Sequence, residues 1–600
     1  MENTTQDYSL KSNLYYIFSH VPNQVKKLGT YLSLYTLSKT ALIILNVVST
    51  KVILEVLFRA FTPQNAFAIV LLLAVCTLVA SIGETIFWNK YWPLVVHIRL
   101  LFLSLLGEKA MKLDYPATET PEFLESLEVA RAASSNNKRG LAGLLLNFSA
   151  IVPAVISCMI CAGIVIGITP WAIIPMFICP FVNFKFSQEY KKIQYQKEYQ
   201  ISEDIDRKKE IISSTFWDFK YGKEIRVFNL AELLIQRFVG LMKEQEEAVQ
   251  CMEKAKFKNT AFSKIVVFTL ESIAYMIVLF RITHVDISFS DFFMIIGAFD
   301  SILLLVEEIL RTLSDIQKNS KEISCFRGFM DMPQKSEQKG ELTLPSEFHS
   351  LEFRQVSFQY PNSDNFAVHN VSFCIEKGQH VALVGLNGSG KTTILKLIMR
   401  LYEPTEGEIL LNGENIQKFT ILEYYTLFST MFQQIQTYAF SIAENIAMGT
   451  QIDSERLKNS IMHSGLYEVI QKLPKKENTQ LLKLMDDTGI EFSGGQMQKL
   501  AFARAIYKNA QIVLLDEPTA ALDAFSEEKM FEAINEFTEG RTSIVVTHRL
   551  SCVQNCNNII CLENGTIVEQ GTHQELMSLK GKYAILFSKQ AALYERGMKN

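Results

Sequence analysis

The chain has 600 residues, of which 48% are hydrophobic and 20% are charged, and its formal net charge is −4. This length exceeds what one hydrophobic core supports, so at least two domains are expected. The weakly acidic balance gives no reason to expect nucleic acid as a partner. Ten cysteines scattered through so long a chain also exclude the disulfide framework of a small secreted protein.

Six apolar segments, each long enough to cross a bilayer, recur through the first half of the chain. They are Tyr31–Ala60, Phe67–Trp88, Leu141–Gly167, Thr169–Phe186, Phe257–His284 and Ser290–Leu313. Short links join the members of each successive pair, whereas long polar stretches with helical periodicity separate the pairs. These stretches carry most of the lysines and arginines, so the positive-inside bias places them, and both termini, in the cytoplasm. We therefore predict a transmembrane domain over residues 1–330 of a cell (plasma) membrane protein.

Some of the predicted spans contain ionisable residues, which are costly in a bilayer and often functional. Lys51 and Glu55 lie four residues apart on one helix and can pair with each other. Glu271 and Asp300 fall nearer the middle of their spans. One hypothesis is that these two acids line a cavity and favour a cationic or amphipathic cargo. The alternative is that they form buried, hydrogen-bonded structure.

The second half begins after a linker at residues 331–347, and we expect an α/β nucleotide-binding domain over residues 348–600. A short apolar strand, His380–Val384, runs into a glycine-rich loop and then a helical pattern. This is the phosphate-binding GxxxxGK[ST] loop in its confirming context. Its nucleotide-binding residues are expected to be Gly385, Asn387, Gly388, Ser389, Gly390, Lys391, Thr392 and Thr393. Lys391 would reach the β- and γ-phosphates of ATP, and the Thr392 hydroxyl would ligate Mg²⁺.

Two adjacent acids, Asp516 and Glu517, end a second apolar strand, Ile512–Leu515. A carboxylate in this place can ligate the Mg²⁺ of a bound nucleotide, which is the role predicted for Asp516. Glu517 would orient and deprotonate the attacking water. Taken alone, the pair also fits a solvated strand end, but the phosphate loop favours the catalytic interpretation.

A third motif, Ser493-Gly-Gly-Gln496, stands between the phosphate loop and the two acids. This order of motifs resembles that of ABC-family ATPases. The resemblance implies that Ser493, Gly494, Gly495 and Gln496 bind the γ-phosphate of a nucleotide held by the opposite subunit. Phe492 stands where the family usually has leucine, and Gln434 stands where it often has an acid. Neither departure removes a catalytic group.

The resemblance assigns four further residues. Tyr360 matches the aromatic residue that stacks on adenine, and Gln433 matches the residue that touches Mg²⁺ and water and senses the membrane domain. Asp523, in Ala521-Leu-Asp523, matches a loop that crosses the dimer interface. His548 matches the histidine that contacts the γ-phosphate. The predicted catalytic residues are thus Glu517, His548, Lys391 and Gln433, and the predicted metal ligands are Thr392, Gln433 and Asp516.

The expected fold is an α-helical six-span transmembrane domain followed by an α/β P-loop NTPase (ABC ATPase) domain. The resemblance implies an ATP- and Mg²⁺-dependent half-transporter of the exporter type, most similar to bacterial peptide exporters for lantibiotics and other bacteriocins. Segments around Trp217–Phe228 and Asp114–Leu124 resemble those that couple the two domains. A homodimer is expected, with a heterodimer as the alternative. Multidrug or lipid export stays open as an alternative, as does an ATP-gated channel or regulator.

Overall fold

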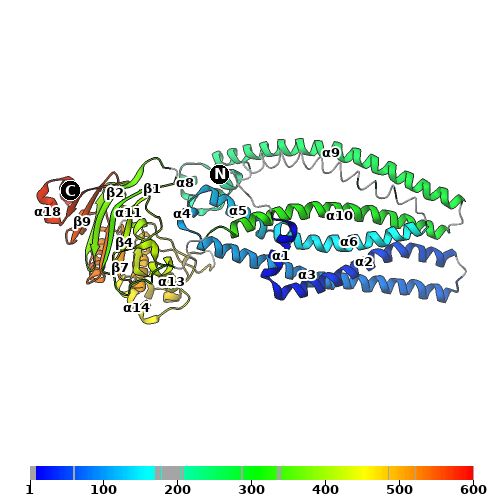
Figure 1. Ribbon diagram of the computed structural model, residues 1–600, viewed down its shortest axis with the longest axis horizontal. Coiled ribbons are helices and arrows are strands. Elements are labelled where there is room, and N and C mark those ends of the chain that lie inside the picture. The colour runs from blue at the N-terminus through cyan, green and yellow to red at the C-terminus, as the bar shows by residue number, and fades with distance from the viewer. Residues whose placement is uncertain are drawn as a thin grey trace. The chain divides into compact units, whose positions relative to one another are not determined.

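The structure is a computed structural model (Figure 1). It describes residues 8–58, 61–168, 208–284, 288–333, 340–361, 363–483, 486–519 and 522–598, together with residues 174, 178, 181 and 205. The chain forms two compact units. The first comprises Met1–Met111 and Leu124–Met332, and the second comprises Lys112–Phe123 and Pro333–Asn600. A short stretch from the first half of the sequence, 112–123, thus belongs to the second unit.

All regular secondary structure in the described residues of the first unit is helical. Figure 1 shows its long helices as extended rods. The elements are α1 (Leu10–His20), α2 (Pro22–Phe58), α3 (Pro63–Lys112), α5 (Pro121–Ser135), α6 (Gly140–Ile168), the 3₁₀ turn η2 (Phe219–Tyr221), α8 (Gly222–Val227), α9 (Ala231–His284) and α10 (Phe289–Met330).

Four helical stretches among the described residues are long and apolar enough to cross a membrane. They are α2, α3, the stretch Glu122–Gly167 that contains α6, and α10. The predicted helical transmembrane domain is therefore confirmed. The expected span Thr169–Phe186 lies outside the described residues, and Phe257–His284 falls within α9, which is not among the four. The number of six spans stays a prediction.

Small and branched side chains hold α2, α6 and α10 together. Val47 of α2, Cys158 of α6 and Phe299 of α10 belong to one buried cluster. Small residues allow helix backbones to approach closely where no water drives their association. The CxxC pair of α6 shares this environment, since Cys158 and Cys161 are both buried and unpaired. Packing explains these two cysteines without a metal.

A polar cluster ties the short helix α1 to the end of α10. The Asn13 side chain is fully buried, and its Nδ2 donates to the carbonyl and hydroxyl oxygens of Ser320, each at 3.0 Å, and to Ser324 Oγ at 3.2 Å. Its Oδ1 accepts a bond of 3.1 Å from the Arg327 guanidinium, which also lies 3.7 Å from the ring centre of Tyr8. Every polar atom of the Asn13 side chain therefore has a partner, as a buried amide requires.

Replacing Asn13 with alanine should destabilise the protein, because four hydrogen-bonding groups of Ser320, Ser324 and Arg327 on α10 would each lose one partner. The cost of such a change is typically ~1–3 kcal/mol. We expect a lower midpoint of thermal unfolding in detergent. Ser19→Ala, on the exposed face of the same helix, is the control and should leave the midpoint unchanged; equal midpoints for both variants would contradict the role of Asn13.

The second unit contains two β-sheets. The first is antiparallel in the order β2-β1-β4-β5, and the second is mostly parallel in the order β10-β9-β3-β8-β7-β6. The strands are β1 (Ser350–Gln359), β2 (Phe366–Glu376), β3 (His380–Gly385), β4 (Glu406–Leu411), β5 (Glu414–Asn415), β6 (Phe428–Met431), β7 (Ile512–Asp516), β8 (Thr542–Val546), β9 (Asn558–Glu563) and β10 (Thr566–Gly571).

Helices accompany these sheets. They are α4 (Tyr115–Thr118), α11 (Lys391–Ile398), α12 (Ile421–Tyr424), α13 (Ile442–Ala447), α14 (Ser454–His463), α15 (Tyr467–Gln471), α16 (Gly494–Lys508), α17 (Ala524–Thr538), α18 (His573–Leu579) and α19 (Lys582–Met598). Among them, α11 and α12 contribute to the core between the sheets, and most of the others pack into separate buried clusters. Every residue of β7 is buried, as expected for a central strand of a covered parallel sheet. The core joins both sheets, and Phe353 and Leu383 are among its fully buried members.

Strand order determines where the chemistry lies. The parallel strands β3, β8, β7 and β6 are neighbours and end at the same edge of their sheet. Each is followed within two residues by a part of the predicted site. The phosphate loop follows β3, His548 follows β8, Glu517 follows β7 and Gln433 follows β6. Ligands of open parallel sheets bind at this carboxyl edge.

Candidate nucleotide site

The phosphate loop turns sharply into α11, and Gly390 is the residue at the turn. Gly390 caps the helix with φ at +102°, a conformation that residues with a side chain rarely adopt. A Cβ atom here would lie 2.8 Å from the carbonyl oxygen of Ala367. The loop can therefore close against β2 only with glycine at this position, which leaves the first backbone N–H groups of α11 available to an anion.

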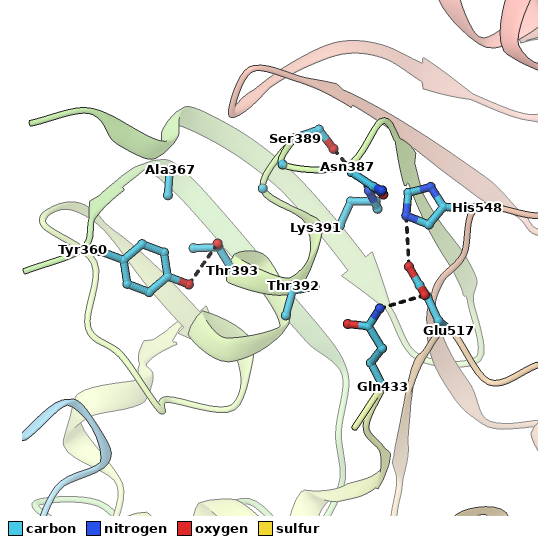
Figure 2. Close-up of a pocket in the computed structure, with 12 residues that line it drawn as sticks. Tyr360, Ala367, Asn387, Ser389, Lys391, Thr392, Thr393, Gln433, Glu517 and His548 are labelled. Atoms are coloured by element: carbon cyan, nitrogen blue, oxygen red, sulfur yellow. Dashed lines mark hydrogen bonds and ion pairs between the residues drawn. The ribbon is translucent and has the colours of Figure 1, made fainter. Parts of the chain in front are cut away.

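A cavity of about 500 Å³ opens above this loop. It gathers most of the predicted nucleotide and catalytic residues, and Figure 2 shows how they surround it. The lining residues are Tyr360, Ala367, Asn387, Gly388, Ser389, Gly390, Lys391, Thr392, Thr393, Gln433, Glu517 and His548. Ala367 is the one that sequence reasoning missed. Its place in an alternating strand indicates only packing, and its role as a wall depends on the pairing of distant segments.

Glu517 stands at the centre of the catalytic side. Gln433 Nε2 donates to Glu517 Oε2 at 2.9 Å, and His548 Nε2 lies 2.9 Å from Glu517 Oε1 (Figure 2). The backbone N–H of Glu517 donates to the carbonyl of Val546 at 2.8 Å. Its φ is +49°, which is strained for a residue with a side chain. The carboxylate is therefore held from both sides and by its own backbone.

Lys391 and Asp516 are buried charges below the loop. The Lys391 ammonium donates to the carbonyl oxygens of Gly385 at 3.0 Å and Leu386 at 2.8 Å. Burial lowers the pKa of Lys391, although Glu517 and Asp516 oppose this shift. Burial, with the charge of Glu517 beside it, raises the pKa of Asp516 to about 6. A partner of opposite charge stabilises the charged form of each group. A phosphate would be that partner for Lys391, and a cation would be that partner for Asp516.

His548 is half-buried, and burial lowers the pKa of its imidazole, with the charge of Lys391 acting in the same direction. The ring is consequently neutral at pH 7 and keeps one donor and one acceptor nitrogen. A neutral ring can accept from or donate to its neighbours without adding charge to the site.

The oxygen donors beside the loop fit a hard divalent cation. The Thr392 hydroxyl bonds to Asp516, and Gln433 has an amide oxygen in addition to the nitrogen that it gives to Glu517. The described residues contain no group of three or more histidine, cysteine or acidic side chains able to hold a metal by themselves. One carboxylate with neutral oxygen donors suits Mg²⁺, which proteins usually bind through one or two carboxylates together with substrate phosphates.

Six of the predicted nucleotide-binding residues do not line the cavity: Gly385, which ends β3, and five residues outside the phosphate loop. Ser493 caps α16, and its hydroxyl and the Gln496 side chain satisfy each other's backbone N–H groups. Gly494 is the first residue of α16, followed by Gly495, and Asp523 caps α17 by accepting from Ser526. Ala521 lies outside the described residues. The proposed contact of these residues with a nucleotide on another subunit stays a prediction.

A part of the chain that contains most of this site matches a known protein family. Residues 368–520 match the model of the ABC transporter family. This segment resembles the ATPase domain of ABC transporters. It holds the phosphate loop, the Ser493 motif and the acids after β7, which are the groups that hydrolysis of ATP requires.

Curated relatives resemble the chain over part of its length. The ATP-dependent lipid A-core flippase of Cupriavidus metallidurans is 37% identical over 301 residues, which are 48% of this chain and 50% of the flippase. The flippase of that name from Xanthomonas campestris pv. campestris strain 8004 is 30% identical over 370 residues, 61% of this chain and 62% of that protein. Multidrug resistance protein 1 of Entamoeba histolytica is 39% identical over 245 residues, covering 40% of this chain and 18% of that protein.

The chain spans about half the length of the first of these flippases. Among solved structures, a bacterial Atm1-family ABC exporter with ATP bound matches 95% of this chain and 99% of its own, with a TM-score of 0.75. Sequence identity is 19%, so this match shows a shared fold. The apolar helices and these matches together indicate an integral membrane protein.

Replacing Gly390 with alanine should weaken nucleotide binding, because the new Cβ would displace the loop from β2. We expect the affinity for a fluorescent ATP analogue to fall at least about tenfold, the effect of ~1.4 kcal/mol. Gly378→Ala is a matched control, since Gly378 has φ at +79° but open space around it. Retained binding in the Gly390 variant would contradict the loop geometry.

Proposed function

We propose that this chain is an ATP-driven exporter of an amphipathic lipid, that it works as a dimer, and that its ATPase domain lies in the cytoplasm. The observation that carries the proposal is the cavity in which Glu517, Gln433 and His548 meet the phosphate loop. Apolar helices joined in one chain to such a site support coupling of hydrolysis to movement through a membrane.

The chemistry assigned to the site is attack of water on the γ-phosphorus of ATP. A new bond forms between the water oxygen and phosphorus, the bond to the bridging oxygen breaks, and ADP and phosphate are released. Glu517 accepts the hydrogen bond of the water and then its proton. Lys391 and the N-terminal N–H groups of α11 stabilise charge on the phosphates. Gln433 and His548 hold the Glu517 carboxylate in place.

The metal role goes to Thr392, Asp516 and Gln433, whose oxygen atoms suit Mg²⁺. Bound there, the ion neutralises charge on the phosphates.

The predicted nucleotide-binding residues that do not line the cavity support a dimer. Ser493 and Gly494 lie exposed at the start of α16, where backbone N–H groups can meet an anion. We assign them to the nucleotide of a second copy, so that each site is shared between two chains. The first unit also exposes an apolar patch, in which Trp217 is 79%, Val227 77% and Phe228 71% exposed. Patches of this kind mark contact surfaces. A heterodimer is the alternative.

The cargo proposal rests on the relatives. The flippases described above are named for lipid A-core, and the Entamoeba protein for multidrug resistance. They support the lipid alternative, while the peptide or bacteriocin export expected from the sequence has no support among them. We therefore propose a lipid amphiphile for this chain, with drug-like amphiphiles as the second candidate.

The head group of this amphiphile should carry a positive charge. Asp300 lies about 16 Å along α10 at about 1.5 Å per residue, near the middle of a bilayer. The side chain of Asp300 is exposed and accepts a hydrogen bond of 2.8 Å from Tyr275 of α9. A carboxylate exposed at this depth is costly in lipid, so we place it, with Glu271, on the transport cavity.

Substituting Glu517 with glutamine should stop turnover without preventing ATP binding, since the amide cannot take the proton. We expect hydrolysis to fall at least about 100-fold while the variant dimerises in ATP. Glu528→Gln, an exposed acid on α17, is the control. Near-normal phosphate release from the Glu517 variant would overturn the assigned base.

Stimulation of ATPase activity tests the cargo. In proteoliposomes, a lipid with an amine head group should stimulate hydrolysis and be translocated, whereas a cationic peptide should not. Asp300→Asn and Glu271→Gln should each lower stimulation about fivefold or more, as loss of a charge-assisted contact does.

Asp315→Asn, on α10 beyond the predicted span, is the control. Stimulation by peptide alone would refute the lipid proposal. ATP-dependent ion conductance without accumulation of any cargo would favour the channel alternative instead.

A further inference from the structure

The side chain of Lys396 on α11 is enclosed by three tyrosine rings and one carboxylate. Its Nζ lies 5.5 Å from the ring centre of Tyr115, 5.6 Å from that of Tyr360 and 5.4 Å from that of Tyr402. Glu119 Oε1 lies 3.7 Å from the same nitrogen. We call these five residues the tyrosine cage. All of them belong to the second unit, although Tyr115 and Glu119 come from the connection at residues 112–123.

The rings hold one another at fixed angles. Tyr360 meets Tyr402 edge to face, with centroids 5.3 Å apart and planes at 82°. Tyr115 meets the same ring at 5.8 Å and 86°. Such edge-to-face pairs are favourable aromatic geometries. The plane of Tyr360 is thus set by Tyr402, while its hydroxyl lies 3.1 Å from Thr393 Oγ1 at the phosphate loop (Figure 2).

Glu119 connects the cage through charge-assisted hydrogen bonds. The hydroxyl of Tyr115 donates to its Oε1 at 2.5 Å, and the hydroxyl of Tyr402 donates to its Oε2. Partial burial opposes ionisation, but the two hydroxyl donors and Lys396 outweigh it and lower the pKa of Glu119. The hydrogen bond that Tyr115 donates to Glu119 raises the pKa of the Tyr115 hydroxyl to about 12. At neutral pH Glu119 is therefore a carboxylate with three partners, of which two touch the ring of Tyr360.

From this geometry we propose that Glu119 and Tyr115 are positioning residues for the adenine of bound ATP. They act through Tyr402 and Lys396 on Tyr360, whose ring forms a wall of the nucleotide cavity. The inference rests on the proposed function, in which Tyr360 stacks on the base. The connection between α3 and α5 then contributes to ATP affinity, although it comes from the membrane half of the sequence.

A reciprocal effect follows from linkage. If residues 112–123 raise the affinity for ATP by ordering Tyr360, then bound ATP must favour the docked state of that connection by an equal factor. Stacking of the base would immobilise Tyr360, and the aromatic contacts would transmit this restraint to Tyr402 and Tyr115. Adenine binding would thereby influence residues 112–123 through the aromatic contacts of Tyr360, whereas phosphate binding acts at the phosphate loop.

Kinetics of the full-length protein test the proposal. Glu119→Gln should raise the KM for ATP about three- to tenfold, the effect of losing one charge-assisted interaction, with kcat unchanged. Inhibition by inorganic tripolyphosphate, a probe of the phosphate loop alone, should stay within twofold of the unmodified protein. Glu122→Gln removes the same charge from the same connection three residues later and should leave KM unchanged.

A second variant shows whether the effect passes through Tyr360. In a Tyr360→Leu background, Glu119→Gln should change KM no further, because the ring that it orients is absent. An added increase in that background, an unchanged KM in the single variant, or an equal loss of tripolyphosphate inhibition would each overturn the proposal. These results differ from failure of the proposed function, which would appear as normal turnover in Glu517→Gln while the Glu119 variant behaved as expected.

Discussion

Parallel pairing of β3, β8, β7 and β6 is the constraint on which the site depends. Hydrogen bonding between these strands places their carboxyl ends at one edge, and residues separated by more than 150 positions in sequence become neighbours there. Glu517 receives a hydrogen bond from Gln433 and lies beside His548 only because β7 runs between β6 and β8. The antiparallel sheet adds Tyr360 and Ala367 to the other side of the cavity. The catalytic geometry is therefore a property of strand order as much as of the side chains.

Local sequence was enough to predict much of this arrangement. The phosphate loop and the acids after β7 are contiguous motifs whose chemistry requires a strand end, so their positions follow from the chain itself. Tyr360, Gln433 and His548 were predicted by their order relative to that loop, and the structure places all three at its cavity. The Ser493 motif does not line this cavity, and its proposed role at the nucleotide of a second chain stays a prediction.

Other features depend on contacts between distant segments, which periodicity does not encode. Glu119 and Tyr402 are 283 residues apart, and although Glu119 lies in the predicted coupling segment Asp114–Leu124, no sequence motif pairs it with Tyr402. Their contact follows from tertiary packing alone, as does the wall formed by Ala367. Apolar length predicted helices of the membrane half, but composition along α9 is mixed, and long amphipathic helices blur where a span begins and ends. The substrate class is harder still to predict from sequence, because the hydropathy of a span reflects its contact with lipid and carries little information about the cargo.

The left-handed backbone at Glu517 has a consequence for how this domain can change by mutation. A residue with a side chain in that conformation costs on the order of 1 kcal/mol or more, whereas glycine adopts it freely. A Glu517→Gly change would relieve that strain while removing the group assigned to proton transfer. Selection for a more stable fold and selection for turnover therefore act in opposite directions at this position. Chains that lose hydrolysis here can retain their folded state, and so persist as nucleotide-binding proteins.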